Sequence, residues 1–144
     1  MESPTSARIG IDAFHRERSR CVDAFATAER AVNDILDSTR SKRGGEPLKQ
    51  RIANLRKVQP MSGYSNTRKL TVDVTLSELE TRLPLRADIV HGCLELVEFP
   101  EDNRACFANA RQEVGPGIQM RTFTLSELRE VTLKVSEIAT RLRV

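Results

Sequence analysis

Two apolar stripes with the spacing of a helix face, one near each end of the chain, constrain the fold more than any other feature of the sequence. The first repeats at steps of three, four and seven residues through Phe14, Cys21, Phe25, Ala28, Val32 and Ile35. The second alternates steps of three and four through Leu128, Val131, Val135, Ile138 and Leu142. Apolar residues in this rhythm occupy one side of an α-helix. We therefore expect a long amphipathic helix from about Pro4 to Ser38, and a final helix after Thr124, which has capping-box spacing to Glu127.

A second, shorter helix is predicted from Pro47 to about Val58. A proline suits the first turn of a helix, and the apolar side of this one would consist of Leu48, Ile52 and Leu55. The long first helix is expected to stop near residues 41–45, where two glycines and a cluster of positive charge offer a C-terminal cap and a turn.

The segment from Asn66 to Leu83 carries two conflicting patterns. A strand-like alternation runs through Leu70, Val72, Val74 and Leu76, whereas helical steps join Leu76, Leu79 and Leu83. A helix is the favoured interpretation. Because Pro84 fits poorly inside a continuous helix, it predicts either a kink or a break, with Pro84 in the first turn of a short new helix that reaches His91 and Gly92.

Short extended segments follow, before the last helix. They are predicted at Cys93–Phe99, Arg104–Ala110 and Ile118–Phe123, separated by a turn at residues 100–103 and a Gly-Pro-Gly turn at residues 115–117. We expect a small β-hairpin or three-stranded meander, lying outside the helices. The fold class is therefore mainly α: a single domain over residues 1–144, built as a four-helix bundle with this β insert before its last helix.

Composition narrows the classes of function. Lys and Arg number 23 against 20 Asp and Glu, so the mild basic excess permits a polyanionic partner without requiring one. No apolar run approaches a membrane span and the N-terminus lacks the pattern of a secretory signal, so we expect a cytoplasmic protein. Three widely spaced cysteines, Cys21, Cys93 and Cys106, support neither a disulfide framework nor a metal site, and no cofactor is expected.

Two histidines are the candidates for proton transfer near neutral pH. His15 lies beside Arg16, Glu17 and Arg18 on the expected solvated side of the first helix, so we assign it no role. His91 follows Arg86 and Asp88 within six residues, close to the bend expected at Pro84. Basic residues elsewhere would form either a phosphate-binding surface or a solvated face, and they are Arg40, Lys42, Arg43, Lys49, Arg51, Arg56 and Lys57.

The segment around His91 resembles the signature of the HEPN superfamily of helical domains. Leu85-Arg-Ala-Asp-Ile-Val-His-Gly92 is similar to the common form Leu-Arg-Asn-Asp-Ile-Val-His-Gly. The likeness extends to residues 46–55 before the motif and residues 121–128 after it, and covers the chain from about residue 46 to its end.

The resemblance implies a metal-independent endoribonuclease that acts on RNA as a homodimer, often as the toxin of a toxin and antitoxin pair or in defence, with a cognate antitoxin protein as a further partner. It implies that His91 is the general acid or base, that Arg86 anchors the phosphate and that Asp88 belongs to the same site. Ala87 departs from the pattern, because many active members carry asparagine there. Asp88 cannot replace that side chain, since one position turns it by about 100° on a helix.

Other functions remain open on the sequence. Ala87 favours a HEPN-like dimer without catalysis that binds a partner protein or a nucleotide. A helical DNA-binding regulator is a weaker alternative, because no helix-turn-helix pair with a basic recognition helix stands out. Any catalytic function requires Arg86 and His91 to come together. Residues five apart on a helix differ in direction by about 140°, so these two need a bend at Pro84 or a second chain to converge.

Overall fold

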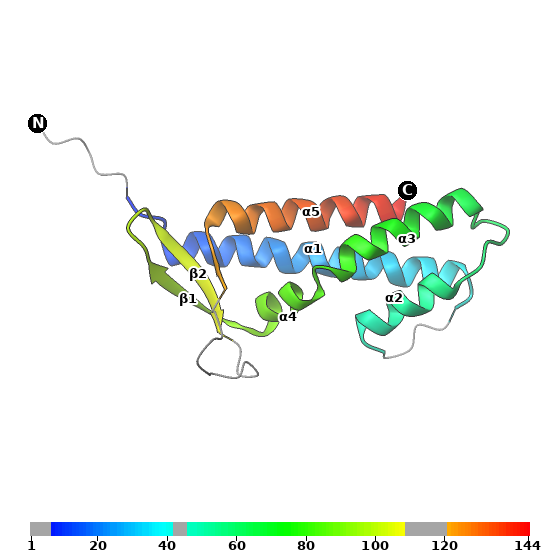
Figure 1. Ribbon diagram of the computed structural model, residues 1–144, viewed down its shortest axis with the longest axis horizontal. Coiled ribbons are helices and arrows are strands. Elements are labelled where there is room, and N and C mark those ends of the chain that lie inside the picture. Colours follow the sequence, from blue (N-terminus) through cyan, green and yellow to red (C-terminus); the bar gives the residue numbers. More distant parts are fainter. Residues whose placement is uncertain (1–6, 42–45, 109–120) are drawn as a thin grey trace, which may run out of the picture.

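In the computed structural model, which describes residues 7–41, 46–108 and 121–144, the chain is mainly helical with a small antiparallel sheet (Figure 1). The helices are α1 (Ile11–Ser38), α2 (Leu48–Lys57), α3 (Asn66–Glu80), α4 (Leu83–His91) and α5 (Leu125–Arg143). The strands are β1 (Cys93–Glu98), β2 (Asn103–Ala108) and β3 (Thr122–Phe123). The two long helices α1 and α5 lie side by side, with the sheet at one end of the pair and α2 and α3 toward the other.

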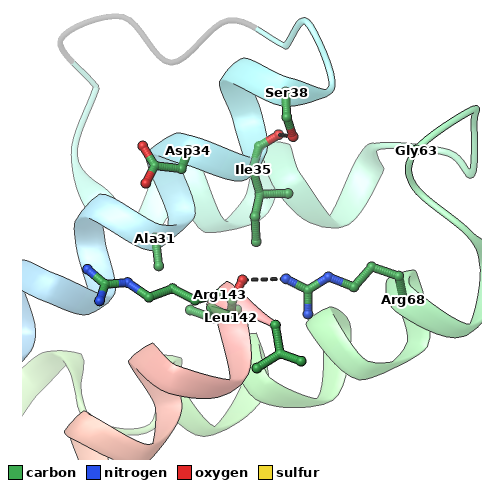
Figure 2. A pocket seen from close by; sticks show the side chains of 9 residues that line it. Ala31, Asp34, Ile35, Ser38, Gly63, Arg68, Leu142 and Arg143 are labelled. Atoms are coloured by element: carbon green, nitrogen blue, oxygen red, sulfur yellow. Dashed lines mark hydrogen bonds between the residues drawn. The ribbon is translucent and has the colours of Figure 1, made fainter.

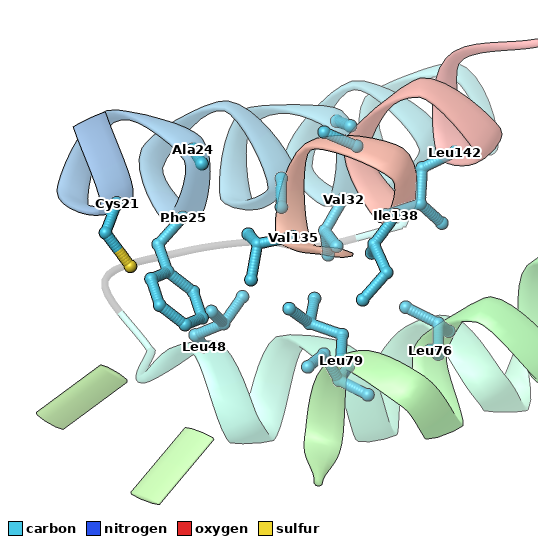
Figure 3. Close-up of a cluster of buried hydrophobic side chains, with 14 of the residues drawn as sticks. Cys21, Ala24, Phe25, Val32, Leu48, Leu76, Leu79, Val135, Ile138 and Leu142 are labelled. Atoms are coloured by element: carbon cyan, nitrogen blue, oxygen red, sulfur yellow. The ribbon is translucent and has the colours of Figure 1, made fainter. Parts of the chain in front are cut away.

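The core forms where the predicted apolar stripes meet. Every member of the first stripe, from Phe14 to Ile35, is buried, and so are the α2 positions Leu48, Ile52 and Leu55. Figure 3 shows side chains of α1, α2, α3 and α5 converging on one cluster, among them Phe25, Leu79 and Ile138. The spacing therefore predicted the buried sides of these helices correctly.

The beginning of α1 differs from the prediction, whereas the helix ends at Ser38 as expected. The helix begins at Ile11, after an extended Gly10, because the preceding segment is held by the β1–β2 turn: the Ile9 N–H donates to Asp102 and the Ile9 carbonyl accepts from Asn103. At the other end, Arg40 takes the left-handed conformation, with φ of 56°, that the prediction gave to a glycine. Pro4 and residues 42–45 lie outside the described residues.

The ambiguous segment is a helix, and its two patterns have separate causes. On α3 the buried side chains are Val72, Thr75, Leu76 and Leu79, which explains the helical steps. Leu70 and Val74 lie one turn apart and are exposed. The strand-like alternation thus arose because apolar residues occupy two opposite sides of one helix.

Pro84 marks a break between helices. After α3 the chain turns at Thr81 and Arg82, and α4 starts at Leu83 with Pro84 in its first turn. Of the two alternatives that the sequence left open, a kink or a new helix, the new helix is the one observed.

The sheet is a three-stranded meander in the order β1-β2-β3. It lies at one end of the helices, and the side chains of Leu94, Ala105, Phe107 and Phe123 join the helical core. β2 ends at Ala108 and β3 begins at Thr122. The expected Gly-Pro-Gly turn, and the ends of the two predicted strands next to it, fall in residues 109–120, outside the described part.

α5 begins with the predicted capping box. The Glu127 N–H donates to the Thr124 hydroxyl and the Thr124 N–H donates to the Glu127 carboxylate, each over 3.0 Å. These hydrogen bonds hold the pKa of Glu127 below its ordinary value. None of the helices in the described ranges is both long and apolar enough to cross a membrane.

The three cysteines are free, and two of them are buried. Burial raises the pKa of the Cys21 thiol to about 11, and burial also raises the pKa of Cys106, whereas Cys93 is exposed. The buried thiols therefore act as small apolar side chains of the core.

Candidate functional site

The motif of residues 85–92 occupies almost the whole of α4, which lies against α1 and the sheet. Ile89 is fully buried and anchors the helix, while Leu83 and Leu85 are half-buried against the same core. Arg86, Ala87 and Asp88 are half-buried, and His91 is exposed in the last turn. The motif is thus carried on a short element at the surface, which Ile89, Leu83 and Leu85 attach to the interior.

Arg86 is paired with an acidic residue of the first helix. Its Nη2 lies 3.3 Å from Oε2 of Glu29, and the other carboxylate oxygen, Oε1, lies 2.8 Å from Nη2 of Arg51. Between 15% and 28% of each of these three side chains is exposed, so the cluster is shielded from bulk water without being sealed. Two guanidinium groups share one carboxylate, which leaves a local excess of positive charge.

Arg51 is fixed more firmly than Arg86. Its Nε donates to the Glu46 carbonyl over 2.8 Å, and its Nη1 donates to the Asn33 side chain over 2.9 Å. Neither Glu29 nor Asn33 was singled out from the sequence. A signal for Glu29 existed, since it follows Ala28 at the edge of the buried stripe of α1 and could meet a cation of a neighbouring helix.

Some of the basic residues expected to form a wider surface are already paired within the chain. Arg56, like Arg51, is engaged, because it lies 3.1 Å from Glu80 and donates to Ser77. Arg40, Lys49 and Lys57 are exposed. Lys42 and Arg43 lie outside the described residues.

Asp88 and His91 lie on the free side of α4. They are three residues apart and so neighbour each other on the helix surface. Neither side chain has a hydrogen-bond or ion-pair partner within the described part of the chain. Both are therefore available for a ligand or a second chain.

The backbone around His91 is held by Arg18 of α1. Its Nε donates to the Ile89 carbonyl over 2.9 Å, and its Nη2 donates to the carbonyls of Val90 and Gly92 over 3.3 and 2.7 Å. Carbonyls at the end of a helix lack partners within the helix, and a guanidinium satisfies several of them at once. Arg18 was expected on the solvated side of α1. That expectation is wrong, because α4 covers it.

Gly92 brings the end of α4 close to β2. Its N–H donates to the Asp88 carbonyl over 2.7 Å, and a Cβ built at Gly92 would collide with that carbonyl oxygen and lie 2.9 Å from Cβ of Phe107. The φ of Gly92 is −75°, which any residue adopts. A glycine is therefore required here because α4 and β2 come close together, and not because the backbone angle is unusual.

Within one chain, Arg86 and His91 are not brought together. α4 is continuous from Leu83 to His91, so the bend at Pro84 comes before both residues and leaves them about 140° apart around the helix. Arg86 instead contacts Glu29, and His91 is exposed. Of the two routes to a composite site, the bend is ruled out and the second chain remains.

Glu17 was also expected to be solvated, and it is buried. Only 3% of the residue is exposed, its Oε2 accepts from the Thr132 hydroxyl over 2.9 Å, and Arg129 lies 3.5 Å from its Oε1. The sequence held a signal, because Glu17 lies between Phe14 and Cys21 at helical spacing on the apolar stripe. His15 is exposed as expected and lines a shallow hollow of about 390 Å³ with Arg18.

Another hollow, of about 480 Å³, lies away from the motif, where the C-terminal ends of α1 and α5 meet the start of α3 (Figure 2). Asp34, Ser38, Arg68 and Arg143 supply its polar atoms. Residues 7–41, 46–108 and 121–144 contain no group of three or more His, Cys, Asp or Glu side chains that could hold a metal ion. The motif on α4 therefore remains the leading candidate site. The chain matches no known protein family, no curated protein and no solved structure.

Proposed function

We propose that this chain is a metal-independent endoribonuclease of the HEPN type that acts as a homodimer. The observation that carries the proposal is the motif helix α4, where His91 is exposed and its backbone is fixed by three hydrogen bonds from Arg18. A reactive imidazole needs both access to substrate and a defined position. α4 leaves the imidazole accessible and fixes the backbone that carries it, at the one segment whose sequence resembles a catalytic motif.

Arg86 has the properties of a phosphate anchor. A guanidinium has five N–H donors, and within the described residues the guanidinium of Arg86 forms a single hydrogen bond, from Nη2 to Glu29. Glu29 can therefore orient Arg86 while the remaining donors bind a phosphate oxygen. Arg51, on the same carboxylate, adds to the positive potential.

The chemistry requires a base and an acid. One imidazole takes the proton from a ribose 2′-hydroxyl, the 2′-oxygen attacks phosphorus, and the bond from phosphorus to the 5′-oxygen breaks. A second imidazole, protonated, gives its proton to that 5′-oxygen, and the products are a 2′,3′-cyclic phosphate and a 5′-hydroxyl. Arg86 stabilises the charge on the phosphate as it develops.

A homodimer provides the two imidazoles. His91 occurs once per chain, and a twofold axis near α4 would put two copies of His91 and two of Arg86 around one groove. In this proposal α1, α2, α3 and α5 correspond to the four-helix bundle of the family. RNA is the substrate, and an antitoxin protein that covers the groove is the expected regulatory partner.

A second function is supported by two specific features. Ala87 lacks the polar side chain common at its position, and Glu29 already neutralises part of the Arg86 charge. Both favour a dimer that has lost catalysis and binds a partner protein or a nucleotide through the α4 surface. The same experiment separates the two functions.

The test is cleavage of a mixed RNA pool in the presence of EDTA, with product ends analysed for 2′,3′-cyclic phosphate. We expect the wild-type protein to cut, and His91→Ala and Arg86→Ala to lose at least about a hundredfold in rate, the usual contribution of general acid–base catalysis or of one charge-stabilising donor. His15→Ala is the matched histidine control and should keep the wild-type rate.

Two outcomes would contradict the proposed nuclease activity. One is equal cleavage by the wild-type and His91→Ala proteins. The other is no cleavage by the wild type, followed by strong cleavage once Ala87→Asn restores the polar side chain. The second result would identify this chain as a non-catalytic member with an otherwise intact site.

A further inference from the structure

The carboxylate of Glu29 on α1 is divided between two arginines that come from different helices. Its Oε1 lies 2.8 Å from Nη2 of Arg51 on α2, and its Oε2 lies 3.3 Å from Nη2 of Arg86 on α4. A guanidinium and a carboxylate frequently pair through two parallel hydrogen bonds that use both oxygens. Here each guanidinium contacts one oxygen, so neither arginine is fully paired with Glu29.

The two arginines are held to different degrees. Arg51 is 15% exposed, and besides contacting Glu29 it donates to the Glu46 carbonyl and to the Asn33 side chain. The guanidinium of Arg86 is 28% exposed and, within the described residues, forms its one hydrogen bond with Glu29. Arg51 is therefore the fixed member that determines where the carboxylate lies, and Arg86 is the member with free donors.

Removing Arg51 would change how Glu29 contacts Arg86. The terminal torsion of a glutamate side chain is soft, so the freed Oε1 can turn toward Arg86 and join Oε2 there. The resulting pair would occupy two of the five donors of Arg86 and neutralise its charge. A phosphate would then have to displace the carboxylate from the same guanidinium. Arg51 thus limits the contact between Glu29 and Arg86.

We infer that Arg51 is a positioning residue for RNA binding: by holding one oxygen of Glu29, it keeps the guanidinium of Arg86 free for a phosphate of the RNA backbone. Arg51 acts through Glu29 and need not touch the substrate itself. The three side chains together carry one excess positive charge, which the single negative charge of a phosphodiester balances.

This inference rests on the proposed function, because it concerns the phosphate site at Arg86, but its own test does not involve cleavage. The probe is single-stranded RNA methylated at every 2′-oxygen, which lacks the hydroxyl that the proposed reaction consumes. Its dissociation constant is measured by fluorescence anisotropy at one fixed salt concentration, since phosphate contacts depend on salt. Cleavage of unmodified RNA is assayed separately.

We expect Arg51→Ala to raise the dissociation constant roughly tenfold or more, because Glu29 then competes with phosphate for Arg86. Arg51→Lys keeps a cation beside Oε1 of Glu29 and should stay within about threefold of the wild type. Circular dichroism verifies that every variant is folded.

Two double variants separate positioning from a general loss of positive charge. Arg51→Ala with Glu29→Gln removes the competing carboxylate and should return the dissociation constant to within about threefold of the wild type. Arg51→Ala with Asp34→Asn has the same net charge, because Asp34 is an exposed carboxylate on the same helix. It should stay roughly tenfold weaker than the wild type, since Glu29 remains free to pair with Arg86.

The inference is overturned if the wild type does not bind the methylated RNA, or if Arg51→Ala binds it as tightly as the wild type. It is also overturned if Glu29→Gln fails to restore binding, or if Asp34→Asn restores it equally well. The nuclease proposal is decided separately. A wild type that shows the expected binding pattern but cuts no RNA sustains the role of Arg51 and rejects the catalysis, whereas cleavage alongside normal binding by Arg51→Ala does the reverse.

Discussion

Gly92 illustrates how a single residue can serve the site without chemistry of its own. The missing side chain lets the last turn of α4 approach Phe107 of β2, and its N–H closes that turn on the Asp88 carbonyl. The exposed His91 precedes it directly. The backbone position of His91 therefore depends on the close approach that Gly92 allows.

We predict that Gly92→Ala lowers the free energy of unfolding by about 1–3 kcal/mol, because the added Cβ overlaps the Asp88 carbonyl and crowds Phe107. Thermal unfolding followed by circular dichroism measures the change. Gly10→Ala is the control, since no heavy atom lies within 4 Å of a Cβ at that position. Its cost should stay below about 1 kcal/mol, the size of an N-cap preference. Equal losses in the two variants would refute the packing argument.

At the scale of elements, α4 depends on α1. α4 has nine residues, too few for an isolated helix to be stable in water, so tertiary contacts must hold it. Ile89 supplies the apolar contact and Arg18 supplies three hydrogen bonds at the C-terminal end. The cation of Arg18 also complements the negative end of the α4 dipole.

We predict that Arg18→Ala loosens the end of α4 while the rest of the protein stays folded. Three carbonyls lose a charged donor, so amide exchange at residues 89–92 should accelerate roughly tenfold or more, which corresponds to about 1.4 kcal/mol of local opening. Hydrogen exchange read by NMR detects this directly. Arg16→Ala, an exposed arginine on the same helix, should leave these amides unchanged. Unaltered exchange in Arg18→Ala would show that Ile89 alone fixes the helix.

For the molecule as a whole, the pairing of α1 with α5 joins the two ends of the sequence. Apolar contacts dominate this seam, but Glu17 lies buried in it and accepts from Thr132 while Arg20 and Arg129 lie near its other oxygen. A buried carboxylate is tolerated only with such partners. The contact between α1 and α5 therefore buries apolar side chains and also fixes how the two helices are aligned along each other.

We predict that Glu17→Ala lowers the free energy of unfolding by about 1–3 kcal/mol. The Thr132 hydroxyl loses the shorter of its two hydrogen bonds and keeps only the one to the Leu128 carbonyl at 3.2 Å, and the removed side chain leaves unfilled space between α1 and α5. Glu17→Gln retains an oxygen acceptor and should lose less than half as much. Urea denaturation at neutral pH gives both values. Glu130→Ala, at an exposed carboxylate of α5, should be nearly neutral. A Glu17→Ala protein as stable as Glu130→Ala would mean that the buried contacts contribute nothing net.

Periodicity and turn chemistry alone determined most of the elements. Because helix contacts are local, neighbouring residues identified the stripe from Phe14 to Ile35, the capping box at Thr124 and an interruption at Pro84, left open as a kink or a break. Residues 85–92 were expected on a helix, either kinked at Pro84 or newly begun there, whereas the motif itself was identified by its resemblance to a family signature. These features depend on residues within one or two turns of each other, which a sequence displays directly.

Only the tertiary structure decided which polar groups meet. The hydrogen bonds from Arg18 to α4 span more than 70 residues, and the Arg86 to Glu29 pair spans 57. No local pattern encodes these contacts, since they depend on how helices pack after the chain has turned several times. The sequence thus indicated where the motif lies, and packing determined that Arg86 points to α1 and that His91 is left exposed.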